Sequence, residues 1–140
     1  MTYLLDTNAC IALIKGTPGN VRDRFQFALA RGSNLAVSSI VVFELWYGVA
    51  KSSRAAKNEA QLLSFLSTPI QVIAFDEEDA KAAGAQRAAL QAVGRPIGAY
   101  DLLIAGQALR YGWTLVTANV SEFARVRGLS WVDWAKSPNS

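Results

Sequence analysis

The sequence predicts a single three-layer α/β/α domain whose central parallel sheet is covered by helices on both faces. Short apolar segments alternate along the chain with longer amphipathic ones, which is the pattern of strands that alternate with helices. With 140 residues, 51% of them hydrophobic and 18% charged, the chain is large enough to bury one sizeable core. It contains no internal repeat, low-complexity segment or linker. We therefore place the domain over residues 1–135 and a short C-terminal tail over residues 136–140.

The first half of the chain is predicted to contain three strands and four helices. In order, these are a strand at 2–6, helices at 7–15 and 18–31, a strand at 35–37, helices at 39–49 and 54–67, and a strand at 70–73. Gly16 and Gly32 stand where glycine commonly ends a helix, and Pro18 suits the start of the second helix. The hydroxyl of Ser38 or Ser39 can cap the third helix.

The second half begins with four consecutive acidic residues at 76–79. We interpret them as the first turn of a helix, where the helix dipole favours negative charge, rather than as a metal site. Residues 95–98 (Arg-Pro-Ile-Gly) break the chain before a helix at 99–111, which Gly112 ends. The remaining elements are a strand at 113–117, a short helix at 121–125 and a strand at 130–132.

The composition restricts the chemistry that the chain can support. It has no histidine, which excludes catalytic triads built on histidine and nucleases that use a histidine pair as acid and base. Zinc is not expected either, because Cys10 is the single cysteine. Any metal would have oxygen ligands, which favours Mg²⁺ or Mn²⁺. The net charge of +3 and the pI of about 9.2 are compatible with a nucleic-acid substrate.

We expect a cytoplasmic protein with no membrane span. The first residues lack the basic segment and small-residue cleavage site of a signal peptide. The apolar runs are shorter than the roughly 20 residues that a membrane helix needs. With one cysteine, no internal disulfide is expected.

Three carboxylates lie in the middle of apolar runs: Asp6, Glu44 and Asp101. Burying an unpaired carboxylate is costly, and no Lys or Arg lies within three residues of any of them. A shared divalent metal ion is the simplest partner for all three. Each also has a structural interpretation, as a helix cap for Asp6, a helix-edge acid for Glu44 and a first-turn acid for Asp101.

The predicted fold gives these acids a place to meet. Active sites of open parallel sheets form at the carboxyl ends of the strands, where Asp6 and Asn119 each follow a predicted strand. Glu122 lies three residues after Asn119, and Asp101 and Glu44 fall in the first two turns of their helices. A magnesium ion in this pocket would activate water and hold a phosphodiester for in-line attack. The polar residues expected to cap helices or to support the ligands are Thr7, Asn8, Ser39 and Thr117.

Five segments of the chain resemble the PIN-domain ribonucleases, and among them the VapC-type toxins of bacterial toxin–antitoxin pairs. They are Tyr3–Asn8 (YLLDTN), Ser38–Gly48 (SSIVVFELWYG), Pro96–Ala105 (PIGAYDLLIA), Leu115–Phe123 (LVTANVSEF), and the closing Arg125–Leu129 with Val132–Trp134. Together they span almost the whole chain. The resemblance implies a PIN-like fold and a magnesium- or manganese-dependent endoribonuclease that cleaves RNA, with structured RNA such as tRNA as the expected substrate.

The resemblance also assigns roles to residues. Asp6 and Asp101 would be the main metal ligands, and Glu44 would complete the acidic site. Asn119 matches a position that carries Asp in many PIN domains, so that its role would be to orient water or metal. Glu122 matches another polar or acidic position of the same loop. Ala118 departs from the family pattern, in which Asn is common at this position. The geometry around the neighbouring Asn119, the fourth residue of the site, can therefore differ from that of the family.

The family further implies protein partners. A VapC-like protein would form a homodimer and would be inhibited by a VapB-like antitoxin whose Arg or Lys reaches the carboxylates. The apolar stretches at 40–50 and 54–67 are candidate contact surfaces.

Two other functions are compatible with the residues. A phosphohydrolase with Asp6 as nucleophile would need a second Asp two residues later, where this chain has Asn8. A non-catalytic PIN-like module that binds RNA or protein would be favoured by the loss of an acid, yet all three acids are present. The sequence does not indicate which RNA is cleaved, where the RNA is cleaved, or how many metal ions bind.

Overall fold

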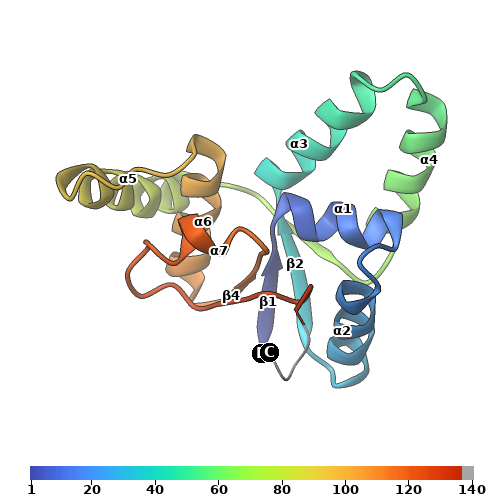
Figure 1. Ribbon diagram of the computed structural model, residues 1–140, viewed down its shortest axis with the longest axis horizontal. Coiled ribbons are helices and arrows are strands. Elements are labelled where there is room, and N and C mark those ends of the chain that lie inside the picture. Colours follow the sequence, from blue (N-terminus) through green and yellow to red (C-terminus); the bar gives the residue numbers. More distant parts are fainter. Residues whose placement is uncertain (137–140) are drawn as a thin grey trace.

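A computed structural model of the chain describes residues 1–136 (Figure 1). Its centre is one sheet with the strand order β3-β2-β1-β4-β5, in which every neighbouring pair is parallel. The strands are β1 (Thr2–Leu5), β2 (Asn34–Ser38), β3 (Gln71–Ile73), β4 (Thr114–Val116) and β5 (Trp131–Val132). Of the predicted tail at 136–140, all but Lys136 lies outside the described residues.

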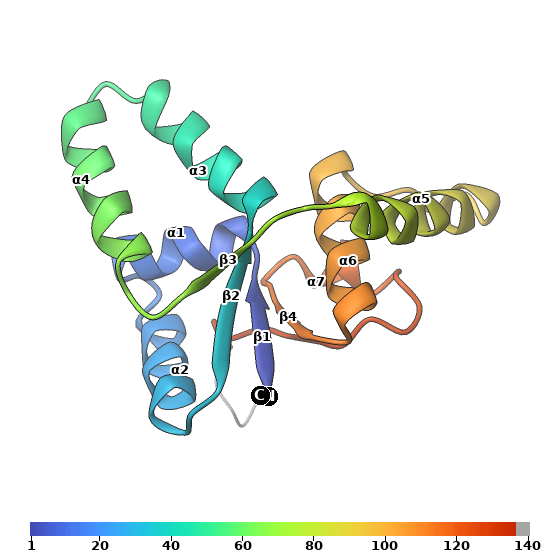
Figure 2. The same ribbon diagram turned by 180° about the vertical axis from the view of Figure 1, so that it is seen from behind.

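Helices connect the strands and cover the sheet on both sides. They are α1 (Thr7–Lys15), α2 (Gly19–Ala30), α3 (Ser39–Ala50), α4 (Ala55–Leu66), α5 (Glu77–Ala92), α6 (Ala99–Tyr111) and α7 (Val120–Phe123). In both views, α1, α2 and α4 gather on one side, and α5, α6 and α7 on the other (Figures 1 and 2). Helix α3 contacts α1, α4 and α6. The predicted three-layer α/β/α fold with a central parallel sheet is confirmed. No helix in residues 1–136 is long and apolar enough to cross a bilayer.

The residues that were expected to begin and end helices do so. Gly16 follows α1 with a positive φ of 78°, a conformation that favours glycine, and Gly112 follows α6 in the same way with a φ of 68°. Helix α7 ends two residues earlier than predicted. After its last turn the hydrogen bonds join residues three apart, as in a 3₁₀ helix. The N–H of Arg125 donates to the carbonyl of Glu122, and the N–H of Val126 donates to the carbonyl of Phe123.

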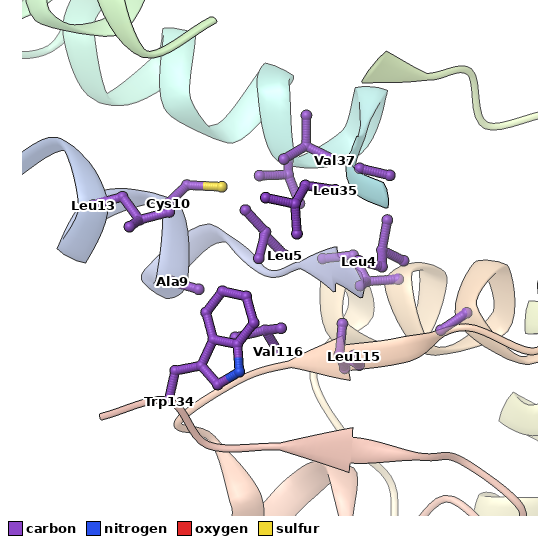
Figure 3. Close-up of a cluster of buried hydrophobic side chains, with 14 of the residues drawn as sticks. Leu4, Leu5, Ala9, Cys10, Leu13, Leu35, Val37, Leu115, Val116 and Trp134 are labelled. Carbon is purple, nitrogen blue, oxygen red and sulfur yellow. The ribbon is translucent and has the colours of Figure 1, made fainter. Parts of the chain in front are cut away.

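The core lies on the central strands, which are buried on both faces as expected for a parallel sheet (Figure 3). Leu4 and Leu5 of β1 are fully buried between the two helical layers. The other core residues labelled in Figure 3 are Ala9, Cys10, Leu13, Leu35, Val37, Leu115, Val116 and Trp134. This packing fixes β1, and with it the position of the residue that follows.

The register of the strands brings their carboxyl ends to one level. Leu5 pairs with Val37 of β2 on one side and with Val116 of β4 on the other. The N–H of Asp6 donates to the carbonyl of Val116 at 3.1 Å. Asp6 and Thr117, which follow the paired residues Leu5 and Val116, therefore lie side by side at this edge.

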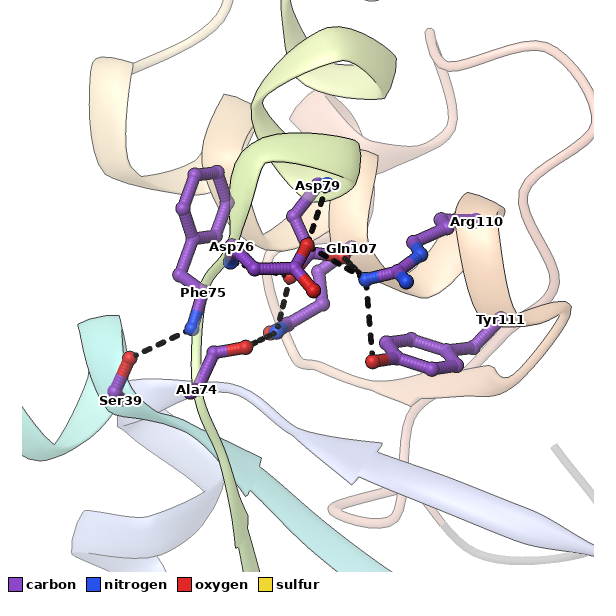
Figure 4. A network of polar contacts seen from close by, with 8 residues as sticks. All are labelled: Ser39, Ala74, Phe75, Asp76, Asp79, Gln107, Arg110 and Tyr111. Carbon is purple, nitrogen blue, oxygen red and sulfur yellow. Dashed lines mark hydrogen bonds and ion pairs between the residues drawn. The ribbon is translucent and has the colours of Figure 1, made fainter.

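The acidic run at 76–79 begins α5, as predicted, and joins it to α6 (Figure 4). Asp76 and Asp79 form a reciprocal capping box, in which each carboxylate accepts from the backbone N–H of the other at 3.1 and 2.9 Å. Arg110 of α6 forms ion pairs with Asp76 at 2.7 Å and with the fully buried Asp79 at 3.0 Å. Gln107 donates to Asp79 and to the carbonyl of Ala74. The network therefore holds the start of α5 against α6.

Candidate active site

Asp6 lies at the junction of β1 and α1 and is almost completely buried. Its Oδ1 accepts from the N–H of Ala9 at 2.8 Å and so caps α1. Burial raises the pKa of Asp6, and repulsion by Glu44 and Asp133 raises it further. Hydrogen bonds from the Thr117 hydroxyl and the Ala9 N–H partly oppose that increase in pKa. Asp6 therefore caps α1 and is at the same time a buried carboxyl group with a raised pKa.

Glu44 lies on the second turn of α3 and is half-buried. Its Oε1 accepts from the hydroxyl of Thr7, the first residue of α1, at 2.7 Å. This bond joins the start of α1 to α3 and holds the Glu44 carboxylate close enough to Asp6 to affect its pKa.

Asp101 forms a second group of polar residues with Asn119 and Glu122. The Nδ2 of Asn119 donates to Asp101 Oδ2 at 3.0 Å and to Glu122 Oε2 at 2.6 Å. The N–H of Gly98 donates to Glu122 Oε1 at 3.1 Å. Asn119 therefore binds both acids with one amide group.

The pKa values of the two acids of this group shift in opposite directions. Burial, followed by hydrogen bonding to Glu122 and repulsion by Glu122 and Asp6, raises the pKa of Asp101 to about 7. The hydrogen bonds that Glu122 receives from Asp101 and Asn119 lower the pKa of Glu122. Of the two acids, Asp101 is therefore the one that is partly protonated near neutral pH, and the repulsion between Asp6 and Asp101 connects the two halves of the site.

The expectation that all three carboxylates are buried is wrong for two of them. Only Asp6 is buried, whereas Glu44 and Asp101 are partly exposed. Asp6 directly follows a fully buried strand. Glu44 and Asp101 stand on the first two turns of helices at the sheet edge, where their carboxylates reach solvent.

The polar residues expected around the ligands separate into two groups. Thr7 and Thr117 contact site carboxylates, as described above. Asn8 is exposed and borders an open cavity of about 440 Å³, which Thr117, Ala118 and Asp133 also line. Ser39 instead accepts from the N–H of Phe75 at 3.0 Å.

Two charged residues near the site were not singled out from the sequence as site residues. Asp133 follows β5 directly and raises the pKa of Asp6, so the strand-end argument that found Asp6 could also have found it. Arg125 lowers the pKa of Glu122 and donates to the carbonyl of Pro96 at 2.8 Å. Its contact with Pro96 joins the segment after α7 to the loop before α6, and no local sequence signal indicates this contact.

The donor set is compatible with a hard divalent cation. Asp6, Glu44, Asp101 and Glu122 offer only oxygen ligands. Within residues 1–136, both ion pairs involve Arg110, so none of these four acids forms an ion pair, although Arg125 lies near enough to Glu122 to lower its pKa. The same residues contain no preformed group of three or more acidic or thiol ligands. Magnesium commonly takes one or two carboxylates and completes its octahedron with water and phosphate oxygens, which suits this spread arrangement.

Comparisons with known proteins give a consistent result. The PIN-domain family profile matches residues 3–129. The tRNA(fMet)-specific endonuclease VapC of Shigella flexneri is 42% identical over 135 residues, which are 96% of this chain and 99% of the relative. Ribonuclease VapC2 of Rickettsia felis is 39% identical over 136 residues, which are 97% of this chain and 100% of the relative.

Solved structures agree with these sequence relatives. A chain of the Rickettsia felis VapBC2 complex bound to a promoter DNA fragment superposes with a TM-score of 0.89 and 36% identity, over 96% of this chain and 99% of that one. A chain of DNA-bound VapBC from Salmonella typhimurium gives a TM-score of 0.87 and 38% identity, over 96% of this chain and 98% of that one.

Proposed function

The chain belongs to the PIN-domain family, in its VapC-type group, and we propose that it is a magnesium-dependent endoribonuclease toxin of a type II toxin–antitoxin pair. The observation that carries this proposal is the set of oxygen ligands at the carboxyl edge of the sheet, in which Asp6, Glu44 and Asp101 form no ion pair in the described chain. Structured RNA is the proposed substrate class, since a relative at 42% identity is named for its action on tRNA(fMet).

Asp6 and Asp101 would hold the metal ion, with Glu44 completing the acidic side of the site. When bound, Mg²⁺ or Mn²⁺ supplies positive charge that activates water and offsets the charge of the phosphodiester. Thr117 orients Asp6, and Thr7 orients Glu44. Asn119 fixes Asp101 and Glu122 without adding a charge.

A VapB-like antitoxin is the proposed inhibitor, because the solved relatives are VapBC complexes. The predicted contact stretches 40–50 and 54–67 form α3 and α4, which contact each other and expose Trp46, Tyr47 and Leu63. A homodimer is the proposed oligomeric state. An antitoxin Arg or Lys that reaches the carboxylates would replace the charge of the metal ion.

Single-turnover cleavage of purified tRNAs, including initiator tRNA(fMet), tests the proposed activity. We expect cleavage with Mg²⁺ or Mn²⁺ and none in EDTA. Asp6→Asn and Asp101→Asn should each reduce the rate by about 100-fold or more, since each removes charge stabilisation worth several kcal/mol. Asp23→Asn changes an exposed acid of α2, a helix that contributes no residue to the site, and should cut like the wild type.

The outcome distinguishes the alternatives. Cleavage that persists in EDTA, or full activity in both site variants, would refute the metal-dependent mechanism. Binding of RNA without any cleavage would favour a non-catalytic PIN-like module. For the partner, replacing the basic antitoxin residue that enters the site should restore cleavage by the complex, and unchanged inhibition would contradict charge replacement.

A further inference from the structure

Two exposed aromatic rings stand beside the acidic site. Phe43 of α3 is 53% exposed and Tyr100 of α6 is 47% exposed. Their ring centroids are 5.8 Å apart and the rings are tilted by 56°. Each ring directly precedes a site carboxylate in the sequence, Glu44 and Asp101 respectively. The pair therefore spans α3 and α6 where these helices carry the site.

The surroundings of this pair differ from those of other exposed aromatic residues. Lys51 lies over the ring of Tyr47 at 4.8 Å, and the guanidinium of Arg31 lies over Phe27 at 5.4 Å. In the described part of the chain, no Lys or Arg lies over Phe43 or Tyr100. Because the two rings are tilted rather than stacked, ring surface of both remains open to solvent.

The charge of the neighbourhood restricts what can bind there. Glu44 and Asp101 repel phosphate oxygens, so the RNA backbone alone gains little at this position. An uncharged base has no such penalty, and an unstacked base gains from contact with an aromatic ring. Any RNA whose backbone enters the acidic site has bases within reach of residues adjacent to Glu44 and Asp101.

We propose that Phe43 and Tyr100 form a stacking platform for an unpaired base next to the scissile phosphate. This inference rests on the proposed ribonuclease function and adds a substrate requirement to it. Cleavage would occur beside a nucleotide whose base can unstack from its neighbours. The occupant is RNA. Contact with a second copy or with an antitoxin is the competing outcome, because Trp46 and Tyr47 continue the exposed apolar face of α3.

Phe43→Ala and Tyr100→Ala test the platform, with Phe43→Tyr and Tyr100→Phe as variants that keep a ring. Phe27→Ala removes a ring of α2 that is somewhat more exposed than either of these and is the matched control. In single-turnover cleavage, the alanine variants should raise the half-saturating concentration by about 5-fold to 50-fold, the usual effect of losing one stacked base. The ring-keeping variants and Phe27→Ala should match the wild type.

An abasic nucleotide beside the cleavage site gives a second, independent readout. It should weaken wild-type binding by a similar factor, but should add little to the defect of Tyr100→Ala, since both changes remove the same contact. RNA binding by the alanine and ring-keeping variants, measured in EDTA where no cutting is expected, tests the two rings even if the wild type cleaves no tested RNA. The platform and the nuclease function are thus judged separately.

Three results would overturn the platform. Alanine variants that bind and cut RNA like the wild type would exclude a stacking role. Equal losses on intact and abasic RNA would show that the rings act through the fold. Normal RNA binding with a lost dimer, measured by light scattering, or with weakened antitoxin binding would assign the pair to a protein interface.

Discussion

Asp6 combines two roles that sequence reasoning treats as alternatives. One of its oxygens caps α1, while burial beside Glu44 and Asp133 raises the pKa of its carboxyl. Thr117 is its main stabilising partner, and the same buried hydroxyl accepts from the N–H of Asn119 at 2.9 Å. The Thr117 hydroxyl therefore connects Asp6 to the backbone of Asn119, whose side-chain amide binds Asp101 and Glu122.

Thr117→Val should expose this dependence, because valine has a similar shape but no hydroxyl. The N–H of Asn119 loses its acceptor and Asp6 loses a donor, so we expect a loss of about 1–3 kcal/mol in the free energy of unfolding. The pKa of Asp6 should rise, which moves the lower limb of the pH–rate profile to higher pH. Urea denaturation and cleavage rates between pH 5.5 and 8.5 measure both effects. An unchanged pH profile would show that Thr117 does not influence Asp6.

The strand-end rule predicted residues that lie at or within a few positions of a strand end better than it predicted contacts that depend on the folding of loops. Asp6 and Asn119 lie where they were expected, and the neglected Asp133 obeys the same rule. The contact of Glu122 with Asp101 depends on how α7 folds back onto the loop before α6. A contact between residues this far apart in the chain has no local signal.

At the scale of elements, α5 and α6 pack unusually closely. A Cβ added at Gly106 of α6 would lie 2.6 Å from backbone atoms of Ala83 in α5, a distance at which atoms overlap. Gly84, one residue further along α5, is exposed and has no heavy atom within 4 Å of its added Cβ. Two glycines at the same helix pair thus have opposite roles.

Gly106→Ala should destabilise the protein by about 1–3 kcal/mol or more, because α5 must move away from α6. Gly84→Ala should stabilise it by about 0.5–1 kcal/mol through helix propensity alone. Thermal unfolding monitored by circular dichroism distinguishes the two. Equal effects at both positions would mean that the close approach does not constrain the helix pair.

The same helix pair depends on Arg110. Removing this side chain leaves Asp79 buried without its ion pair, so Arg110→Ala should cost about 2–4 kcal/mol of unfolding free energy. The capping N–H of Asp79 and the ion pair with Arg110 lower the pKa of Asp76. Their contribution is therefore complete above the unfolded pKa near 4 and is lost as the pH falls through the lower folded value. Denaturation at pH 7 and pH 3 should show a larger Arg110→Ala effect at pH 7, and equal effects would contradict this ion-pair assignment.

The sequence predicted the start of α5 from its acids but not this network. A run of four acids at a helix start is a local signal, as are the glycines after α1 and α6. Arg110 meets Asp79 only because α6 packs on α5, 31 residues later in the chain. Local boundaries were therefore predictable, whereas tertiary ion pairs and the partial exposure of Glu44 and Asp101 were not.

At the scale of the whole molecule, the acids at the carboxyl edge make one surface electrostatically unfavourable within a chain of net charge +3. Elements from all parts of the sequence contribute to it, from the β1–α1 junction, α3, α6 and the loop after β4. Their mutual repulsion is a cost of the fold that a bound cation would offset. Metal affinity and fold stability are therefore both expected to depend on the protonation of these carboxyl groups.

This coupling leads to a prediction about metal removal. The folded pKa of Asp101 is about 7, above the unfolded value of 3.8, so metal-free protein should lose stability as the pH rises from about 4 to about 7. Because Asp101 is half exposed, screening limits the loss to roughly 1–2 kcal/mol. Mg²⁺ bound at Asp101, as proposed, would compete with the proton there, so saturating Mg²⁺ should raise the melting temperature by several degrees at pH 7.5 and much less at pH 5.

Asp101→Asn separates this effect from general ion binding. The variant cannot ionise at this position, and its amide can still donate to Glu122, so its metal-free form should be more stable than the wild type at pH 7.5 but not at pH 4. It should also gain little from Mg²⁺ at either pH. Differential scanning fluorimetry with Mg²⁺ and with EDTA measures all of these values. A magnesium shift of equal size at pH 5 and pH 7.5 in the wild type would show that the ion binds away from Asp101.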